Sequence, residues 1–236
     1  ANDKLKTFNL GVGNEKGKLE LFDYEDNDGS AHASLYKEVI TDLHGKGAVS
    51  HSVEVIKLDD FFMEYKIDTI DLLKIDTEGN EYNVLLGAEK YLTEKKIKAI
   101  HFEFNEMNII SKIYFKNFWD LLIGFEFYRM LPNGNLIRLK KYSPLSCEIY
   151  AFQNIVAILK KWKYQAPPFT LTNILAEYLL VKKIICLVEG LDLTVLASND
   201  WAKYRPKVVL AEVLGSSLNK LEKDPVYNYM VTQGYT

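Results

Sequence analysis

Residues 70–79 read IDLLKIDTEG and combine a short, mostly apolar run with an acidic end that contains a glycine. The run at 70–75 is typical of a strand that is buried in a sheet. Asp76, Glu78 and Gly79 follow where such a strand would reach the surface. Two carboxylates and a glycine at a strand end make this stretch the first candidate for a functional site.

The flanking segments alternate between helical and extended patterns, which predicts an α/β fold with a mostly parallel sheet and helices on both faces. Helices are expected at 58–65, 82–92 and 115–122, and strands at 4–10, 18–22, 97–104, 125–131, 136–139 and 147–152. The sequence PNGN at 132–135 predicts an antiparallel hairpin at the edge of the sheet. Ligands bind outside the carboxyl ends of strands in such sheets, where Asp76, Glu78, Glu103 and Asn105 are expected.

A second part of the chain repeats this pattern in a shortened form. The sequence APP at 166–168 predicts a boundary, which divides the chain into a unit at 1–158, a linker at 159–169 and a partial second unit at 170–236. Glu189-Gly190 corresponds to Glu78-Gly79, but Leu187 stands where the first unit has Asp76. Leucine can neither accept a hydrogen bond nor take a proton, so the second unit is expected to lack the function of Asp76.

Composition excludes several classes of function. The chain has 236 residues with 29 Lys+Arg against 32 Asp+Glu, and this mildly acidic balance argues against nucleic acid as a partner. The four histidines show no metal-ligand spacing, so no metal site is predicted. No apolar run is long enough to span a membrane. Both cysteines lie in apolar surroundings without a redox motif, which favours a reducing, cytoplasmic location.

The sequence IDTEGNEYNVLLGA at 75–88 resembles the FkbM-type methyltransferase family. The family pattern is a hydrophobic strand that ends in Ile-Asp-x-Glu-Gly, followed by a helix with Val-Leu-x-Gly-Ala. The flanks LDDF at 58–61 and FE at 102–103 are similar to the family as well, and LDLTVL at 191–196 resembles it in a different variant.

The resemblance implies a class I methyltransferase-like, Rossmann-like fold that binds S-adenosylmethionine. It also implies methylation of a hydroxyl group on a small molecule, a sugar or glycan, or another natural product. By this resemblance Asp76, Glu78 and Glu103 are the expected catalytic residues, and Asp76 and Gly79 are expected to contact the cofactor. A carboxylate there is available to take the proton of the accepting hydroxyl.

The glycine-rich cofactor loop of the family is absent from the sequence, and GVGNEKG at 11–17 does not replace it because a strand pattern follows. With Ala1 as its first residue, the chain is expected to be the C-terminal portion of such an enzyme, to bind the cofactor weakly or not at all, and to need an upstream segment. The alternative is a degenerate, non-catalytic remnant that serves as a binding or scaffold module. A third hypothesis is a glycan-processing enzyme with paired carboxylates. The second unit is expected to pack on the first or on another chain, as in a homo-oligomer.

Overall fold

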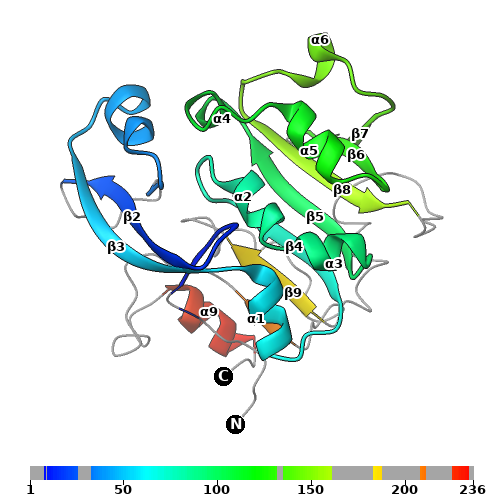
Figure 1. Cartoon of the computed structure of the whole chain (residues 1–236), viewed down its shortest axis with the longest axis horizontal. Coiled ribbons are helices and arrows are strands. Elements are labelled where there is room, and N and C mark those ends of the chain that lie inside the picture. The colour runs from blue at the N-terminus through cyan, green and yellow to red at the C-terminus, as the bar shows by residue number, and fades with distance from the viewer. Residues whose placement is uncertain are drawn as a thin grey trace.

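The structure is a computed structural model that describes residues 8, 10–25, 33–131, 135–160, 183–187, 208–210 and 225–233. A small sheet and a large sheet contain all of the strands in these ranges (Figure 1). The small sheet has the order β1-β3-β2, and the large sheet has the order β10-β9-β4-β5-β8-β6-β7. The strands are β1 Gly11–Val12, β2 Gly17–Tyr24, β3 Ala48–Ile56, β4 Ile70–Ile75, β5 Ile97–Phe104, β6 Phe125–Met130, β7 Leu136–Leu139, β8 Gln153–Leu159, β9 Lys183–Leu187 and β10 Val208–Leu210.

Short helices connect these strands, and α2, α3 and α5 lie in front of the large sheet in Figure 1. The described helices are α1 Leu58–Glu64, α2 Glu81–Leu86, α3 Glu89–Thr93, α4 Met107–Ile110, α5 Phe115–Leu121, α6 Pro144–Cys147 and α9 Pro225–Thr232, with a π-helical turn η1 at Val39–Leu43. None of the described helices has the length and hydrophobicity needed to cross a membrane.

The large sheet contains both parallel and antiparallel pairings. The prediction of a mostly parallel sheet with an antiparallel edge hairpin is therefore confirmed only in part. Strands β10, β9, β4 and β5 pair in parallel, whereas β8 pairs antiparallel with both β5 and β6, and β7 pairs antiparallel with β6. The predicted antiparallel hairpin is therefore present as β6 and β7, although residues 132–134 of its turn lie outside the described residues. The parallel half of the sheet contains β4, the strand that leads to the acidic stretch.

The apolar core lies between one face of the large sheet and the helices. Strand β4 is buried along its whole length, as expected for the centre of a parallel sheet. Leu73 and Ile75 of β4 pack in one cluster with Phe102 of β5 and Phe118 of α5, and the rings of Phe102 and Phe118 stack at 4.6 Å. Because side chains alternate along a strand, Lys74 is on the face opposite Leu73 and Ile75.

The structure corrects two of the predicted elements. The helix predicted at 82–92 is two helices, α2 and α3, which are separated by a turn at Gly87-Ala88. Gly87 packs against the backbone of Gly13 so closely that a Cβ atom at this position would collide with the Gly13 carbonyl oxygen. The strand predicted at 147–152 is wrong: Cys147 ends helix α6, which starts at Pro144, and the strand begins only at Gln153. Proline is favoured in the first helical turn, and this outweighs the alternating pattern that follows it.

The segment after residue 160 contributes two strands to the large sheet. Strand β9 pairs in parallel with β4, with Leu72 beside Ile184 and Ile75 beside Leu187, and β10 continues the sheet beyond β9. Most of the predicted linker, together with Glu189 and Gly190, lies outside the described residues. The division into two units and the repeat stay predictions.

The pairing of β4 with β9 can be tested by disulfide trapping. Leu72→Cys with Ile184→Cys places two thiols on directly paired residues, so we expect a cross-link under mild oxidation that mass spectrometry of the unreduced peptides identifies. Val209 is paired with Ile184 from the far side, about 10 Å from β4 across two strand spacings. The control pair Leu72→Cys with Val209→Cys exceeds the reach of a disulfide and should stay reduced; equal trapping of both pairs would contradict the strand order.

Candidate functional site

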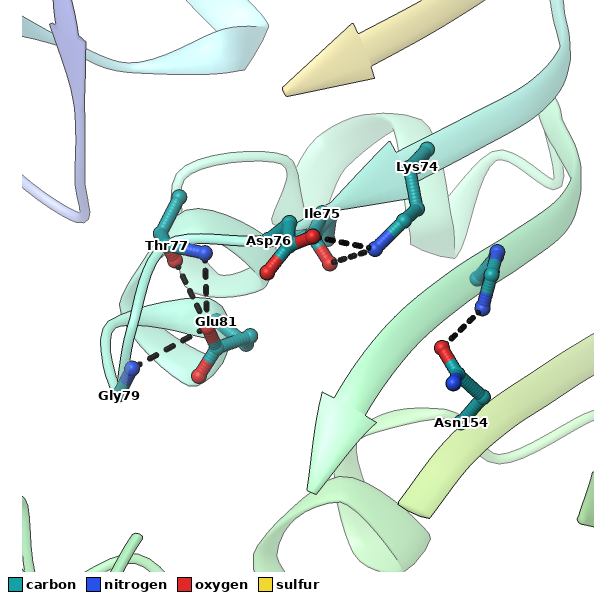
Figure 2. A network of polar contacts seen from close by, with 8 residues as sticks. Lys74, Ile75, Asp76, Thr77, Gly79, Glu81 and Asn154 are labelled. Atoms are coloured by element: carbon teal, nitrogen blue, oxygen red, sulfur yellow. Dashed lines mark hydrogen bonds and ion pairs between the residues drawn. The ribbon is translucent and has the colours of Figure 1, made fainter. Parts of the chain in front are cut away.

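The turn between β4 and α2 is held in place by one buried carboxylate. Glu81 accepts hydrogen bonds from the backbone N–H of Thr77 at 2.9 Å, the Thr77 hydroxyl at 3.1 Å and the Gly79 N–H at 3.2 Å (Figure 2). Burial raises the pKa of Glu81, and the hydrogen bonds from the backbone act in the opposite direction. Glu81 thereby satisfies donors that precede the helix, as a side chain in the first turn commonly does.

The backbone of the same turn adopts a conformation that side chains disfavour. Gly79 has a φ of 103°, and Glu78 has a φ of 48° although it is not a glycine. A non-glycine residue in this region costs of order 1–3 kcal/mol and is concentrated at functional sites. A Cβ at Gly79 would also lie 3.4 Å from the Cβ of Met107, so both the φ angle and the neighbouring side chain favour glycine there.

The N-terminal part of the chain supports the turn from the other side. The Ser34 hydroxyl donates a hydrogen bond to the carbonyl oxygen of Glu78 at 2.8 Å. The Asn80 side chain donates to the carbonyl oxygen of Val12, at the end of β1, at 3.0 Å. The glycine-containing segment that begins at residue 11 thus contacts the acidic turn.

Asp76 forms a buried ion pair with a lysine of the same strand. Lys74 Nζ lies 3.0 Å from Asp76 Oδ2, and both side chains are only 6% exposed (Figure 2). The same ammonium group is 3.4 Å from the carbonyl oxygen of Ile75. These contacts orient the Asp76 side chain at the carboxyl end of β4.

Glu78 and Glu103 complete a cluster of acids at this edge of the sheet. The register places Ile75 beside Phe102, so Asp76 and Glu103 follow at neighbouring positions of β4 and β5. Burial raises the pKa of Glu103 to about 8, and the charge of Asp76 acts in the same direction. Burial, followed by the charges of Asp76 and Glu103, also raises the pKa of Glu78 to about 8. Both glutamates are therefore mostly protonated at neutral pH.

His101 extends this polar region across the sheet. It lies beside Lys74 in the register of β4 and β5, and its Nε2 is 2.8 Å from the Oδ1 of Asn154 on β8 (Figure 2). Burial and the nearby charge of Lys74 lower the pKa of His101 to about 3. The imidazole is therefore neutral at physiological pH.

The structure places the predicted site residues in one region but also shows residues that the sequence argument missed. Asp76, Glu78, Gly79 and Glu103 lie at the carboxyl ends of β4 and β5, whereas Asn105 accepts a hydrogen bond from the N–H of Met107 and so caps the start of α4. The residues that were missed are Ser34, Lys74, Asn80 and Glu81. Lys74 carried a signal, because it is the one cation in the otherwise apolar and acidic stretch IDLLKIDTEG.

Metal chemistry has no geometric support in the part of the chain that the structure describes. No three His, Cys, Asp or Glu side chains there are arranged to hold a metal ion. The acids of the cluster interact with Lys74 and with backbone N–H groups instead. The cluster places the carboxyl groups of Asp76, Glu78 and Glu103 at one edge of the sheet, and the pKa values of the two glutamates are raised.

Comparison with known proteins gives this arrangement a family context. Residues 1–165 match the model of the Methyltransferase FkbM domain. The chain is also similar to the 2-O-methyltransferase NoeI of Sinorhizobium fredii (strain NBRC 101917 / NGR234), with 27% identity over 147 residues. This alignment covers 56% of the chain and 57% of that relative. No solved structure matches the chain.

The raised pKa values of the glutamates predict how stability depends on pH. Glu103 has a folded pKa of about 8 against an ordinary value of 4.5, so between these values the native state holds a proton that the unfolded chain has released. The unfolded state binds fewer protons, and the free energy of unfolding therefore falls as the pH rises through this window. In Glu103→Gln the group is neutral in both states. We expect urea unfolding between pH 5 and pH 8 to show a shallower decline for this variant, whereas the exposed control Glu20→Gln should decline like the wild type.

The strained backbone of Glu78 predicts a stabilising substitution. Glu78→Gly removes a left-handed non-glycine residue and a buried acid, so we expect the free energy of unfolding to rise by about 1 kcal/mol. Lys66→Gly is the matched control, because Lys66 has a φ of 53° but is exposed. A larger gain at Glu78 than at Lys66, measured by chemical denaturation, isolates the cost of the buried carboxyl group; a loss of stability at Glu78 would show that its side chain stabilises the fold.

Proposed function

The chain belongs to the FkbM methyltransferase family, and we propose that it is an S-adenosylmethionine-dependent O-methyltransferase that acts on a hydroxyl group of a sugar, a glycan or another natural product. The observation that carries the proposal is the acid cluster of Asp76, Glu78 and Glu103 at the carboxyl ends of β4 and β5. Ligands of open α/β sheets bind at this edge. The name of the Sinorhizobium relative, a 2-O-methyltransferase, supports an oxygen atom as the methyl acceptor.

The reaction needs a group that takes up one proton. When bound, the cofactor supplies a methyl group from its sulfonium; the new bond joins this carbon to the acceptor oxygen, and the hydroxyl proton must leave. A proton acceptor has to be ionised before the reaction. Asp76 satisfies this condition because Lys74 favours its charged form, whereas Glu78 and Glu103 are mostly protonated at neutral pH. We therefore assign proton uptake to Asp76 and hydrogen bonding of the acceptor to the two glutamates.

The charges of the site fit a cationic cofactor. Burial keeps Glu78 and Glu103 mostly protonated at neutral pH, and a cationic ligand at this edge would favour their ionised forms. Asp76 is the residue proposed to hold the amino group of the cofactor. Gly79 is proposed to contribute through its backbone, because its φ of 103° allows the turn that places Glu78 beside Asp76.

A non-catalytic binding or scaffold module is the competing interpretation, because the family's glycine-rich loop is absent from the sequence. The relative's alignment covers little more than half of its length, so its activity is carried over only as a proposal. The buried free thiol of Cys147 supports the proposed reducing, cytoplasmic location. The two interpretations differ in what they expect of cofactor binding and of Asp76.

Calorimetry and a methyl-transfer assay separate these interpretations. We expect micromolar binding of S-adenosylmethionine to the full chain, together with formation of S-adenosylhomocysteine in the presence of p-nitrophenyl glycosides that carry a free 2-hydroxyl. Asp76→Asn should lower kcat by about 10²–10⁴-fold, the usual contribution of a general base. Asp60→Asn, at an exposed position of α1, is the control and should keep full activity.

Three outcomes would contradict the proposal or a part of it. Absence of both binding and turnover by the wild-type chain would favour the non-catalytic module. Equal turnover of 2-deoxy glycosides would exclude the 2-hydroxyl as the methylated position, and release of free sugar would instead revive the hypothesis of a glycan-processing enzyme.

A further inference from the structure

We infer that Lys74 is a positioning residue of this site, which acts on the reaction only through Asp76 by holding its carboxylate ionised and oriented. The inference rests on the proposed function. It also assigns a role to the one cation that the structure places inside the acid cluster.

The location of Lys74 is unusual for a lysine. It lies in the fully buried strand β4 and is only 5% exposed, although lysine is almost never buried unless it is paired. Asp76 forms the one ion pair that Lys74 makes within the described part of the chain. One residue, Ile75, separates Lys74 from Asp76, which directly follows the end of β4, so both side chains lie on one face and the pair needs no long-range contact to form.

The other groups around the pair show why Asp76 needs this partner. Glu78 from the turn, Glu81 from α2 and Glu103 from β5 interact electrostatically with Asp76. Glu78 and Glu103 are buried to a similar extent and both lie near the charges of Asp76 and Glu81, and burial raises the pKa of each to about 8. Asp76 meets these neighbours in a direct ion pair with Lys74, with 3.0 Å between Nζ and Oδ2, and an opposite charge at this distance favours the ionised form of a carboxyl group.

The neighbour of Lys74 on the other strand does not compete for its charge. His101 is paired with Lys74 in the register of β4 and β5, but its ring is neutral and contacts Asn154. The ammonium group is therefore directed to Asp76 and to the carbonyl oxygen of Ile75. A lysine with these contacts fixes both the charge and the direction of the aspartate.

Carboxyl ¹³C NMR measures the inferred effect without any need for turnover. In Lys74→Met, which keeps the length of the side chain but not its charge, we expect the titration midpoint of Asp76 to rise by about 1–3 pH units, the usual effect of losing a nearby opposite charge. Lys74→Arg should keep the midpoint close to that of the wild type. An unchanged midpoint in Lys74→Met would overturn the inference whether or not the protein transfers methyl groups.

The pH profile of methyl transfer provides the second readout. If Lys74 acts through Asp76, the loss of kcat in Lys74→Met should be largest at low pH and should recover as the pH rises and Asp76 ionises. A loss that is equal at all pH values would indicate a structural role only. Failure of the wild type to turn over any glycoside would refute the proposed function, whereas the NMR titration would still decide the role of Lys74.

A double-mutant cycle keeps the test decisive if the single variant does not fold. Lys74→Met combined with Asp76→Asn leaves no unpaired charge, so we expect it to fold better than Lys74→Met alone. Its residual kcat should equal that of Asp76→Asn, because Lys74 then has no partner through which to act. A further loss of tenfold or more in the double variant would show a direct role of Lys74 and would overturn the inference.

Discussion

The hydrogen bonds that Glu81 accepts from Thr77 and Gly79 fix the turn on which the acid cluster depends. Without them, the backbone N–H groups of Thr77 and Gly79, which precede α2, would lack a hydrogen-bond partner in a buried region, and this would lower the stability of the fold. The turn decides where Asp76 and Glu78 lie relative to β5. Ser34 and Asn80 connect the same turn to the N-terminal part of the chain, so the small sheet supports the site although it contributes no acid to it.

The cluster reduces stability in two ways that a purely structural turn would avoid. Glu78 occupies a left-handed backbone conformation, and burial keeps Glu78 and Glu103 protonated at neutral pH. Asparagine or glycine would fit the backbone at position 78 better, and glutamine would avoid the cost of ionisation. Strain and perturbed carboxyl groups that coincide at one strand end are typical of sites that are retained for chemistry.

The sequence predicts the centre of the fold better than its periphery, because burial leaves a clear pattern only there. Strands β4 and β5 agree with the prediction at both ends, since both are mostly apolar and buried along almost their whole length. Strand β3 was missed because most of its side chains are exposed or half-buried and its apolar pattern is weak. The meeting of Asp76 with Glu103 followed from the rule for parallel strands. The roles of Lys74 and Glu81 did not, because they depend on where individual side chains point.

The order of strands in the large sheet connects the site with the C-terminal segment. From β4 the chain continues to β5 on one side, whereas the strand on the other side, β9, comes from more than a hundred residues later. The direction of strand order therefore reverses at β4, and such switch points are where α/β sheets bind ligands. Without β9, β4 would be an open edge strand and its carboxyl end would border solvent on one side. Strand β9 of the C-terminal segment thus supports the site, because it makes β4, which leads directly to Asp76, a central strand.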